Sequence, residues 1–253
     1  MNNIMENASL SIHESAEVNS ENNIATILLP AKNEAHTICR CIDTYRKHPK
    51  VGEIIVIANG CVDNTAILAR NCKASVIETS ISGKGNALML GAQKAKFPIL
   101  ISIDSDNTNP HVDIITKLLS SSPSNKRIVK GSFNREVHPG PVTDILLKPI
   151  LKISGHPLGK LSQPLSGVFA CGTSWFRSLK LPAGFGVDLQ IVLAAINTNI
   201  EIHEVDIVNF EHKNRDWNHY REMSIEIVEV LFENGFIKRF SKNVNEAGSS
   251  DNK

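Results

Sequence analysis

The sequence predicts an α/β fold with a mainly parallel central sheet and helices on both faces. Short apolar segments rich in β-branched residues alternate with segments whose apolar residues recur at helical spacing. Turn-forming pairs such as Asn-Gly and Asp-Asn separate these segments. Strands that alternate with helices are joined by right-handed crossovers, so neighbouring strands run parallel.

The first half of the chain shows this alternation most regularly. Residues 99–103 form an apolar run typical of a buried parallel strand, and the run leads straight into Asp104 and Asp106. In order, we expect a strand at 24–29 ended by Pro30, a helix at 35–47, a strand at 53–57, a helix at 65–72, a strand at 74–78, a helix at 86–96 and the strand at 99–103.

The pattern becomes less regular after Pro110. Pro149 falls inside an apolar helical segment, which it must kink or end. In order, we expect a helix at 111–120, a strand at 127–133, a helix at 142–153, a loop that enters a strand over 163–171, a short helix at 174–179, a helix at 187–197 after a glycine hinge, a strand at 200–210 and an amphipathic helix at 222–240 interrupted by Gly235.

The chain of 253 residues is long enough for one large α/β domain. Residues 1–22 and 241–253 are polar, and we expect both to be disordered. We expect residues 23–240 to form a single domain. It would have a nucleotide-binding half over 23–110 and an acceptor-binding half over 111–240.

Composition argues against several classes of partner. Lys and Arg number 27 and Asp and Glu 26, so the net charge gives no support for a nucleic-acid partner. The polar N-terminus does not resemble a signal peptide, and no apolar run approaches the roughly 18 residues that span a bilayer, so we expect no membrane partner. Five cysteines without metal-ligand spacing indicate reduced thiols and a cytoplasmic location.

Asp104 and Asp106 are the strongest candidates for a functional site. Residues i and i+2 of an extended segment point the same way, so both carboxylates could face one ligand at the carboxyl edge of the sheet. Hard divalent cations bind carboxylate oxygens and share phosphate oxygens with them. This pattern predicts a metal–diphosphate site; the alternative is a solvated Asp-rich turn. Lys84, between Gly83 and Gly85, could approach a phosphate, or could simply occupy an exposed turn.

Several segments together resemble a known family. Residues 29–34 (LPAKNE), 59–65 (NGCVDNT), 83–88 (GKGNAL) and the Asp-Ser-Asp motif at 104–106 resemble the GT-A glycosyltransferases. Residues 139–146 (PGPVTDIL), 163–170 (QPLSGVFA), 184–189 (GFGVDL) and 212–214 (HKN) are similar to the retaining glucosyl-3-phosphoglycerate synthase family. The matches run in order from about residue 24 to residue 217.

This resemblance implies a GT-A (Rossmann-like) fold with a C-terminal acceptor-binding part. It also implies a metal-dependent retaining glycosyltransferase that moves a hexose, glucose from UDP-glucose, to a small acceptor such as 3-phosphoglycerate or a related metabolite. Mg²⁺ or Mn²⁺ would bridge the donor diphosphate. Retention would follow from attack on the front face, with the departing phosphate helping to deprotonate the acceptor.

The resemblance also implies roles for individual residues, with Lys84 and Asp188 as the catalytic pair and Asp106 and His212 as metal ligands. Residues expected to bind the nucleotide sugar are Pro30, Ala31, Asn33, Glu34, Asn59, Lys84, Asp104, Ser105 and Asp106. Residues expected to bind the acceptor are Gly140, Thr143, Ser166, Phe185, Asp188 and Asn214.

Four positions depart from the family pattern, and they leave the substrates open. Pro141 stands where the family has an arginine that grips phosphoglycerate, and Phe185 replaces a tyrosine. Ala58 replaces an acidic residue and Asn86 a glutamate. The alternatives are a transferase with another acceptor, as in nucleoside or other natural-product biosynthesis, a sugar nucleotidyltransferase, or a non-catalytic subunit that binds nucleotide sugar. The amphipathic C-terminal helix could form the face of a homodimer.

Overall fold

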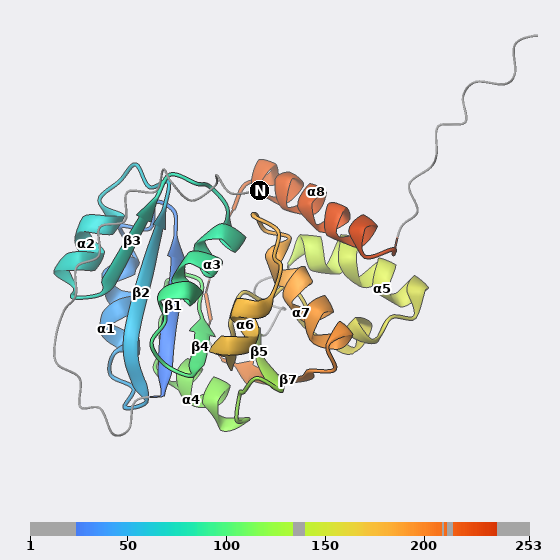
Figure 1. Ribbon diagram of the computed structural model, residues 1–253. Coiled ribbons are helices and arrows are strands. Elements are labelled where there is room, and N and C mark those ends of the chain that lie inside the picture. Colours follow the sequence, from blue (N-terminus) through green and yellow to red (C-terminus); the bar gives the residue numbers. More distant parts are fainter. Residues whose placement is uncertain (1–23, 134–139, 209, 212–214, 237–253) are drawn as a thin grey trace, which may run out of the picture.

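A computed structural model describes residues 24–133, 140–208, 210–211 and 215–236 (Figure 1). A seven-stranded sheet with the order β3-β2-β1-β4-β6-β5-β7 forms the centre of the molecule. The strands are β1 (Ala25–Ala31), β2 (Val51–Asn59), β3 (Ser75–Thr79), β4 (Ile99–Ser102), β5 (Arg127–Phe133), β6 (Phe169–Gly172) and β7 (Glu201–Ile207). Strand β6 runs antiparallel to β4 and β5, whereas the other paired strands are parallel.

Helices cover both faces of the sheet, as the sequence predicts. The helices α1 (Ile38–Tyr45), α2 (Thr65–Asn71) and α4 (Asp113–Ser120) pack on one face. The opposite face is covered by α3 (Lys84–Lys94), α6 (Thr173–Ser178) and α7 (Val187–Asn197). Along β1, Ile27 and Leu29 enter the first core and Leu28 the second, which is the period-two alternation of a strand buried on both faces.

A third apolar cluster lies beyond α7. It joins α7 to α8 (Trp217–Glu233), to the π-helix η1 (Val142–Leu147) and to α5 (Lys148–Ser154). The short 3₁₀ helix η2 (Pro157–Lys160) follows α5. The helix expected at 142–153 is thus a π-turn followed by an α-helix. Pro149 is the second residue of α5, so the proline predicted to kink or end this helix lies where π-helical bonding gives way to α-helical bonding.

Two predicted boundaries are wrong for identifiable reasons. Strand β1 does not end at Pro30 but continues through it to Ala31. Pairing of β1 with β4 stops at Leu28, so the N–H that Pro30 lacks would have had no ladder partner on that side. Helix α8 begins at Trp217, five residues before the predicted start, because the Asp216 carboxylate caps it by accepting from the His219 backbone N–H at 2.9 Å.

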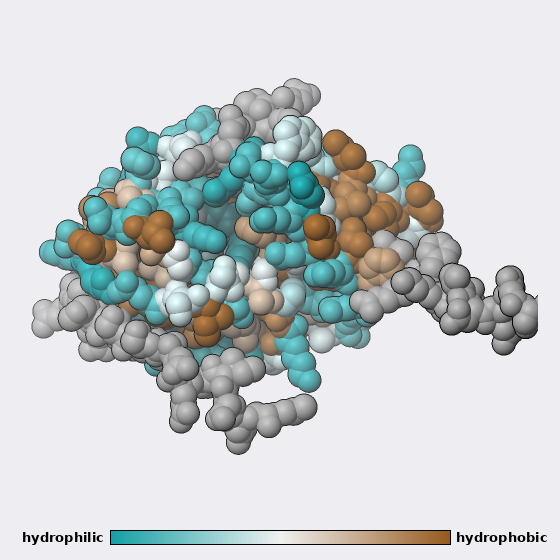
Figure 2. Space-filling view, turned by 90° about the horizontal axis from the view of Figure 1, so that it is seen from above, coloured by the Kyte–Doolittle hydropathy of each residue, from teal (hydrophilic) through white to brown (hydrophobic). Residues whose placement is uncertain are grey.

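The outer surface of the third cluster carries exposed apolar side chains. Ile145, Ile153 and Ile225 are more than half exposed and lie on η1, α5 and α8. Figure 2 shows hydrophobic side chains gathered on this side of the molecule, with polar side chains over the middle of the same view. The homodimer face expected on the last helix stays a prediction. Within the described residues, no helix combines the length and apolarity required to cross a membrane.

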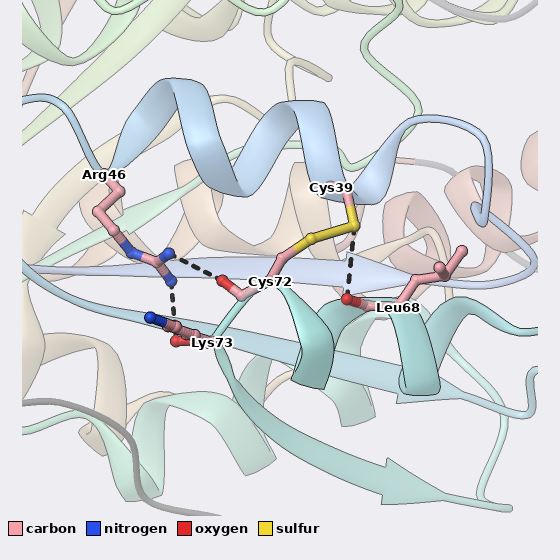
Figure 3. Close-up of a disulfide and its surroundings, with 5 residues drawn as sticks. All are labelled: Cys39, Arg46, Leu68, Cys72 and Lys73. Atoms are coloured by element: carbon pink, nitrogen blue, oxygen red, sulfur yellow. Dashed lines mark hydrogen bonds between the residues drawn. A yellow bond between two sulfur atoms is a disulfide. The ribbon is translucent and has the colours of Figure 1, made fainter.

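The expectation that all five cysteines are reduced is wrong. Cys39 on α1 and Cys72 at the end of α2 form a disulfide with a Cα–Cα distance of 5.8 Å (Figure 3). Cys41, Cys61 and Cys171 are free thiols, and burial raises the pKa of Cys41 to about 12. The sequence could not indicate the pair, because the two residues are 33 positions apart and meet only when α1 packs against α2. The disulfide removes the cysteine-based argument for a reducing compartment.

Thiol titration is expected to distinguish the two states of this pair. The unfolded protein should expose three thiols without reductant and five after reduction. Reduction should also lower the free energy of unfolding by about 3–4 kcal/mol, since the bond closes a loop of 33 residues in the unfolded chain. Five titratable thiols in protein never exposed to reductant would contradict the pairing.

Candidate active site

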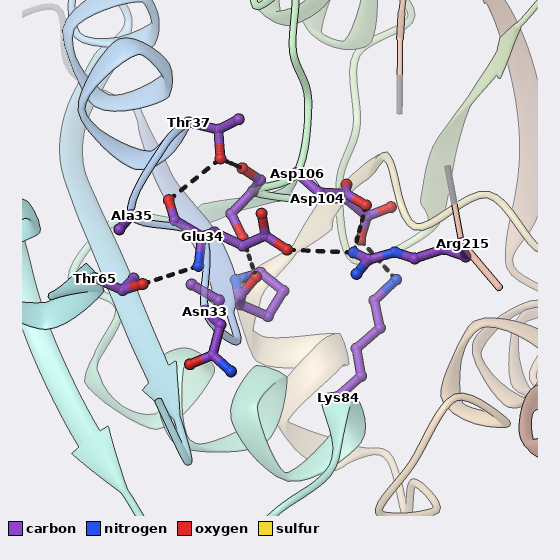
Figure 4. Close-up of polar contacts among 12 residues, drawn as sticks. Asn33, Glu34, Ala35, Thr37, Thr65, Lys84, Asp104, Asp106 and Arg215 are labelled. Carbon is purple, nitrogen blue, oxygen red and sulfur yellow. Dashed lines mark hydrogen bonds and ion pairs between the residues drawn. The ribbon is translucent and has the colours of Figure 1, made fainter. Parts of the chain in front are cut away.

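The site lies at the carboxyl ends of the four parallel strands β1 to β4. Strand β1 sits between β2 and β4, so the strand order reverses there, and ligands of open α/β sheets bind at such a reversal. The loops that leave these strands are braced against one another. The Ser105 hydroxyl donates to the Pro30 carbonyl at 2.6 Å, and the Glu34 N–H donates to the Thr65 hydroxyl at 2.9 Å. The predicted nucleotide-binding loops therefore form one connected edge (Figure 4).

Asn33 and Asn59 hold the loops that flank this edge. Asn33 adopts a left-handed conformation (φ 59°), and its side-chain oxygen accepts from the Val62 N–H at 2.8 Å. The Asn59 amide donates to the Gly83 carbonyl at 2.8 Å, just before Lys84. The Asn59 Oδ1 atom is buried and has no hydrogen-bond partner among the described residues. It is therefore available to a ligand.

The two glycines beside Lys84 have a packing role that the sequence did not reveal. A Cβ atom on Gly83 or Gly85 would collide with the backbone of Pro182 and Ala183. The Asn86 N–H also donates to the Ala183 carbonyl at 3.1 Å. The start of α3 is thus pressed against the segment that leads into α7, and this brings Lys84 close to Asp188.

Lys84 joins the two halves of the chain. Its Nζ atom lies 2.8 Å from Asp104 Oδ1 and 2.9 Å from Asp188 Oδ2. Lys84 starts α3, Asp104 follows β4, and Asp188 lies in the first turn of α7. We call these three residues the Lys84 junction. The exposed-turn alternative for Lys84 is wrong, because its side chain is only 12% exposed.

Charge and burial oppose each other at the Lys84 junction. Burial alone would lower the pKa of Lys84, but Asp104 and Asp188 together raise it above its ordinary value. Burial raises the pKa of Asp188, and Lys84 acts in the opposite direction. Asp188 Oδ1 is buried without a hydrogen-bond partner in the described part of the chain. The junction therefore holds a charged lysine and presents one carboxylate oxygen to a ligand.

A second ion cluster lies beside the first. Arg215 donates to Asp106 Oδ2 at 2.6 Å and lies 3.3 Å from Glu34 Oε1. These carboxylates hold the pKa of Arg215 above its ordinary value despite burial. The sequence interpretation missed Arg215. Glu34 and Asp106 are nearly buried acids on separate loops, and such acids require a cationic partner. Arg215, in the polar segment 212–217, was a candidate for that partner once the Asp-Ser-Asp motif was identified.

The predicted metal ligand His212 lies outside the described residues, as does Asn214. The described residues on both sides contact the loop that carries Asp106. The Glu211 carbonyl accepts from the Thr108 N–H at 2.9 Å, and Arg215 binds Asp106 itself. Within the described ranges, no three His, Cys, Asp or Glu side chains gather as metal ligands.

The remaining acceptor-side residues lie in three places. Gly140 precedes η1 and the nearly buried Thr143 lies within it. The Phe185 ring packs edge-on against His219 of α8, with 4.8 Å between ring centroids. Ser166 is buried, and its hydroxyl accepts from the Val168 N–H at 3.2 Å. Ser166 therefore uses its side chain to shape the turn that enters β6.

Comparisons with known proteins agree with this architecture. The model of the family described as "Glycosyl transferase family 2" matches residues 26–180. The glucosyl-3-phosphoglycerate synthase of Mycobacterium tuberculosis (strain CDC 1551 / Oshkosh) is 27% identical over 233 residues, which cover 81% of this chain and 72% of that protein.

Solved structures of the Mycobacterium tuberculosis glucosyl-3-phosphoglycerate synthase are similar as well. The complex with Mn²⁺, UDP and phosphoglyceric acid has a TM-score of 0.76 and 28% identity, covering 83% of this chain and 78% of that one. The complex with Mn²⁺ and UDP-glucose has a TM-score of 0.77 and 27% identity, covering 86% and 80%.

Proposed function

This chain belongs to glycosyl transferase family 2 and is a glycosyltransferase, and we propose that it transfers glucose from UDP-glucose to a small acceptor with Mg²⁺ or Mn²⁺ as cofactor. The observation that carries the proposal is the Lys84 junction, in which a lysine from the predicted nucleotide-binding half bonds to a buried carboxylate of the predicted acceptor-binding half. The sugar would lie where the two halves meet.

We propose that the donor lies along the carboxyl edge of β1 to β4. Pro30, Ala31, Asn33, Glu34, Asn59, Asp104 and Ser105 would line its nucleotide and sugar. Three things support this: the connected loops, the free Asn59 Oδ1 atom, and the UDP and UDP-glucose in complexes of the mycobacterial relative.

Asp106 and His212 would hold the divalent cation. The residues fit such an ion, because Asp106 and Glu34 already share a cationic partner, the guanidinium of Arg215. The Asp106 carboxylate is a ligand that Mg²⁺ and Mn²⁺ both accept, and imidazole suits Mn²⁺ better. When bound, the cation would offset the negative charge that develops on the departing diphosphate.

We propose retention of configuration by attack on the front face of the sugar. The acceptor oxygen bonds to the anomeric carbon, the bond from that carbon to the UDP oxygen breaks, and the electron pair leaves with UDP. The acceptor proton passes to the departing phosphate oxygen. Asp188 would orient the sugar or acceptor through its free Oδ1 atom, and Lys84 would keep Asp188 ionised.

The acceptor would lie between η1, the turn at Ser166 and the start of α7, near Gly140, Thr143, Phe185 and Asn214. The complexes of the mycobacterial enzyme hold phosphoglyceric acid. At Pro141 this chain has no arginine fork for a phosphate or carboxylate. A panel of phosphorylated and unphosphorylated acceptors, with product mass as the readout, would therefore identify the acceptor directly.

Metal removal is the first test of this function. With Mn²⁺ present, we expect purified protein to release UDP from UDP-glucose. Chelation by EDTA should reduce the rate by about 100-fold or more, since a bound divalent cation supplies several kcal/mol of charge stabilisation. Added Mn²⁺ should restore the rate. Failure to bind or turn over UDP-glucose or any other nucleotide sugar in the presence of Mn²⁺ would overturn the proposal.

A further inference from the structure

Lys130 on β5 is a buried cation to which the proposed reaction gives no role. Its side chain is fully buried, and its Nζ atom donates to the Ser166 carbonyl and lies 5.7 Å from the centroid of the Phe169 ring. Burial lowers the pKa of Lys130 to about 8. Removing an ammonium group from water costs several kcal/mol, so a buried lysine calls for compensating contacts.

A carboxylate on the next strand binds the same loop as Lys130. Glu204 on β7 is the register partner of Lys130 on β5. Its carboxylate accepts from the N–H groups of Ser162 and Gln163 at 2.8 and 2.9 Å, and from the Ser162 hydroxyl at 3.1 Å. Two neighbouring strands thus hold residues 162–166 at both ends. Glu204 accepts from the first two backbone N–H groups of the segment, and Lys130 donates to its last carbonyl.

The held segment leads directly to the Lys84 junction. Gly167 follows Ser166, and a Cβ atom at this position would collide with Lys84 Nζ and with both carboxylate oxygens of Asp104. The backbone at Gly167 therefore touches the ion pair itself. Beyond it, the Val168 carbonyl accepts from the Gly131 N–H at 2.8 Å, which ties this end of the segment to β5 as well.

We propose that Lys130 and Glu204 are positioning residues, which hold residues 162–167 against the Lys84 junction and so fix the place where donor sugar and acceptor meet. The catalytic consequence rests on the proposed function. Neither side chain is among the residues proposed to contact donor or acceptor, and both bond to residues 162–166. They act through the backbone at Gly167, and a displacement of about 1 Å at this point could cost on the order of 100-fold in rate.

Lys130→Met tests the proposal because it keeps length and volume but removes the donor. We expect kcat for UDP release from UDP-glucose with Mn²⁺ to fall at least ~10-fold. We expect KM for UDP-glucose and Kd for UDP to stay within about threefold, since this segment meets the donor site at Lys84 and Asp104, whereas Pro30, Asn33 and Asn59 bond to other parts of the chain. Hydrogen exchange should rise in residues 162–168 and remain unchanged in β1 and β2.

Glu204→Gln gives a second variant at a partly exposed position, in case Lys130→Met does not fold. One amide oxygen replaces two carboxylate oxygens. We therefore expect kcat to fall and hydrogen exchange in residues 162–168 to rise, both by less than in Lys130→Met. The double variant should be no slower than Lys130→Met alone, because both residues act on one segment.

Arg127 and Glu201 are a matched control: they are register partners on the same two strands, form a cross-strand ion pair at 2.7 Å and touch no site residue. Arg127→Met should retain wild-type kcat.

Three results would overturn the positioning role. These are wild-type kcat in Glu204→Gln and in any folded Lys130→Met, unchanged exchange in residues 162–168, or a rate loss accompanied by increased exchange across the whole sheet, which indicates general destabilisation. If the wild-type protein itself releases no UDP, the proposed function fails. The exchange measurement then still tests whether the two residues hold the segment.

Discussion

Lys84→Met is expected to reduce kcat for UDP-glucose by about 100-fold or more, the cost of removing one well-placed charged donor from an active site. It should also lower the free energy of unfolding by about 3–5 kcal/mol, the usual cost of removing one partner of a buried ion pair. Asp104 and Asp188 would be left together without their cation, and the Asp188 side chain is only 3% exposed. Urea titration and UDP release measure the two effects.

The pH dependence of Lys84→Met provides a further check. Burial and Asp104 already raise the pKa of Asp188, and the loss of Lys84 would raise it more. An acid whose pKa is raised in the folded state stabilises the fold less as pH increases towards that pKa. The difference in free energy of unfolding between wild type and variant should therefore become smaller as the pH is lowered from 7.5 to 5.

Lys96→Met is the control for Lys84→Met, because Lys96 is 63% exposed and lies 4.0 Å from Glu53. An equal loss of activity in both variants would contradict the role of Lys84.

Asp106→Asn is expected to abolish metal-dependent turnover while the protein stays folded. The substitution preserves shape but removes the charge that would bind the cation, and several kcal/mol of charge stabilisation correspond to about 1,000-fold in rate. Mn²⁺ titration of UDP binding should show a weakened metal site, and His212→Ala should behave alike.

The matched control for Asp106→Asn is Asp113→Asn on α4, since the Asp113 side chain is 65% exposed and faces His111. It should retain both Mn²⁺ affinity and turnover. If Asp106→Asn and His212→Ala both turned over UDP-glucose with wild-type dependence on Mn²⁺, the metal assignment would be wrong.

Local sequence pattern was sufficient for most of the fold. Short apolar runs rich in β-branched residues predicted every strand of the sheet, and the strand at 127–133 has the predicted bounds. The direction of β6 could not be predicted, because strand patterning does not depend on which way the chain runs. The end of β1 was predicted too early for a similar reason. Whether the strand can continue through Pro30 depends on where the neighbouring strand β4 ends.

The site shows the same division between local and long-range information. The resemblance indicated Lys84, Asp104 and Asp188, but the bond between Lys84 and Asp188 joins residues 104 positions apart and depends on backbone packing at Gly83 and Gly85. Arg215 was missed because its importance arises from two distant acids. Lys130 looked like one alternating residue of a strand, and only its burial and its bond to Ser166 distinguish it.

The reversed direction of β6 also determines where the protein can be engineered. The chain enters this strand beside the Lys84 junction and leaves it at the far edge, where the Gly172 N–H donates to the Ser124 carbonyl and the Thr173 N–H to the Pro98 carbonyl. Fluorescent tags or new chain termini are therefore best introduced near the exposed Ser122 at that far edge. Inserted residues between 162 and 168 would instead alter the contact of Gly167 with Lys84 and Asp104, so this short turn is the place to vary in libraries that seek new acceptors.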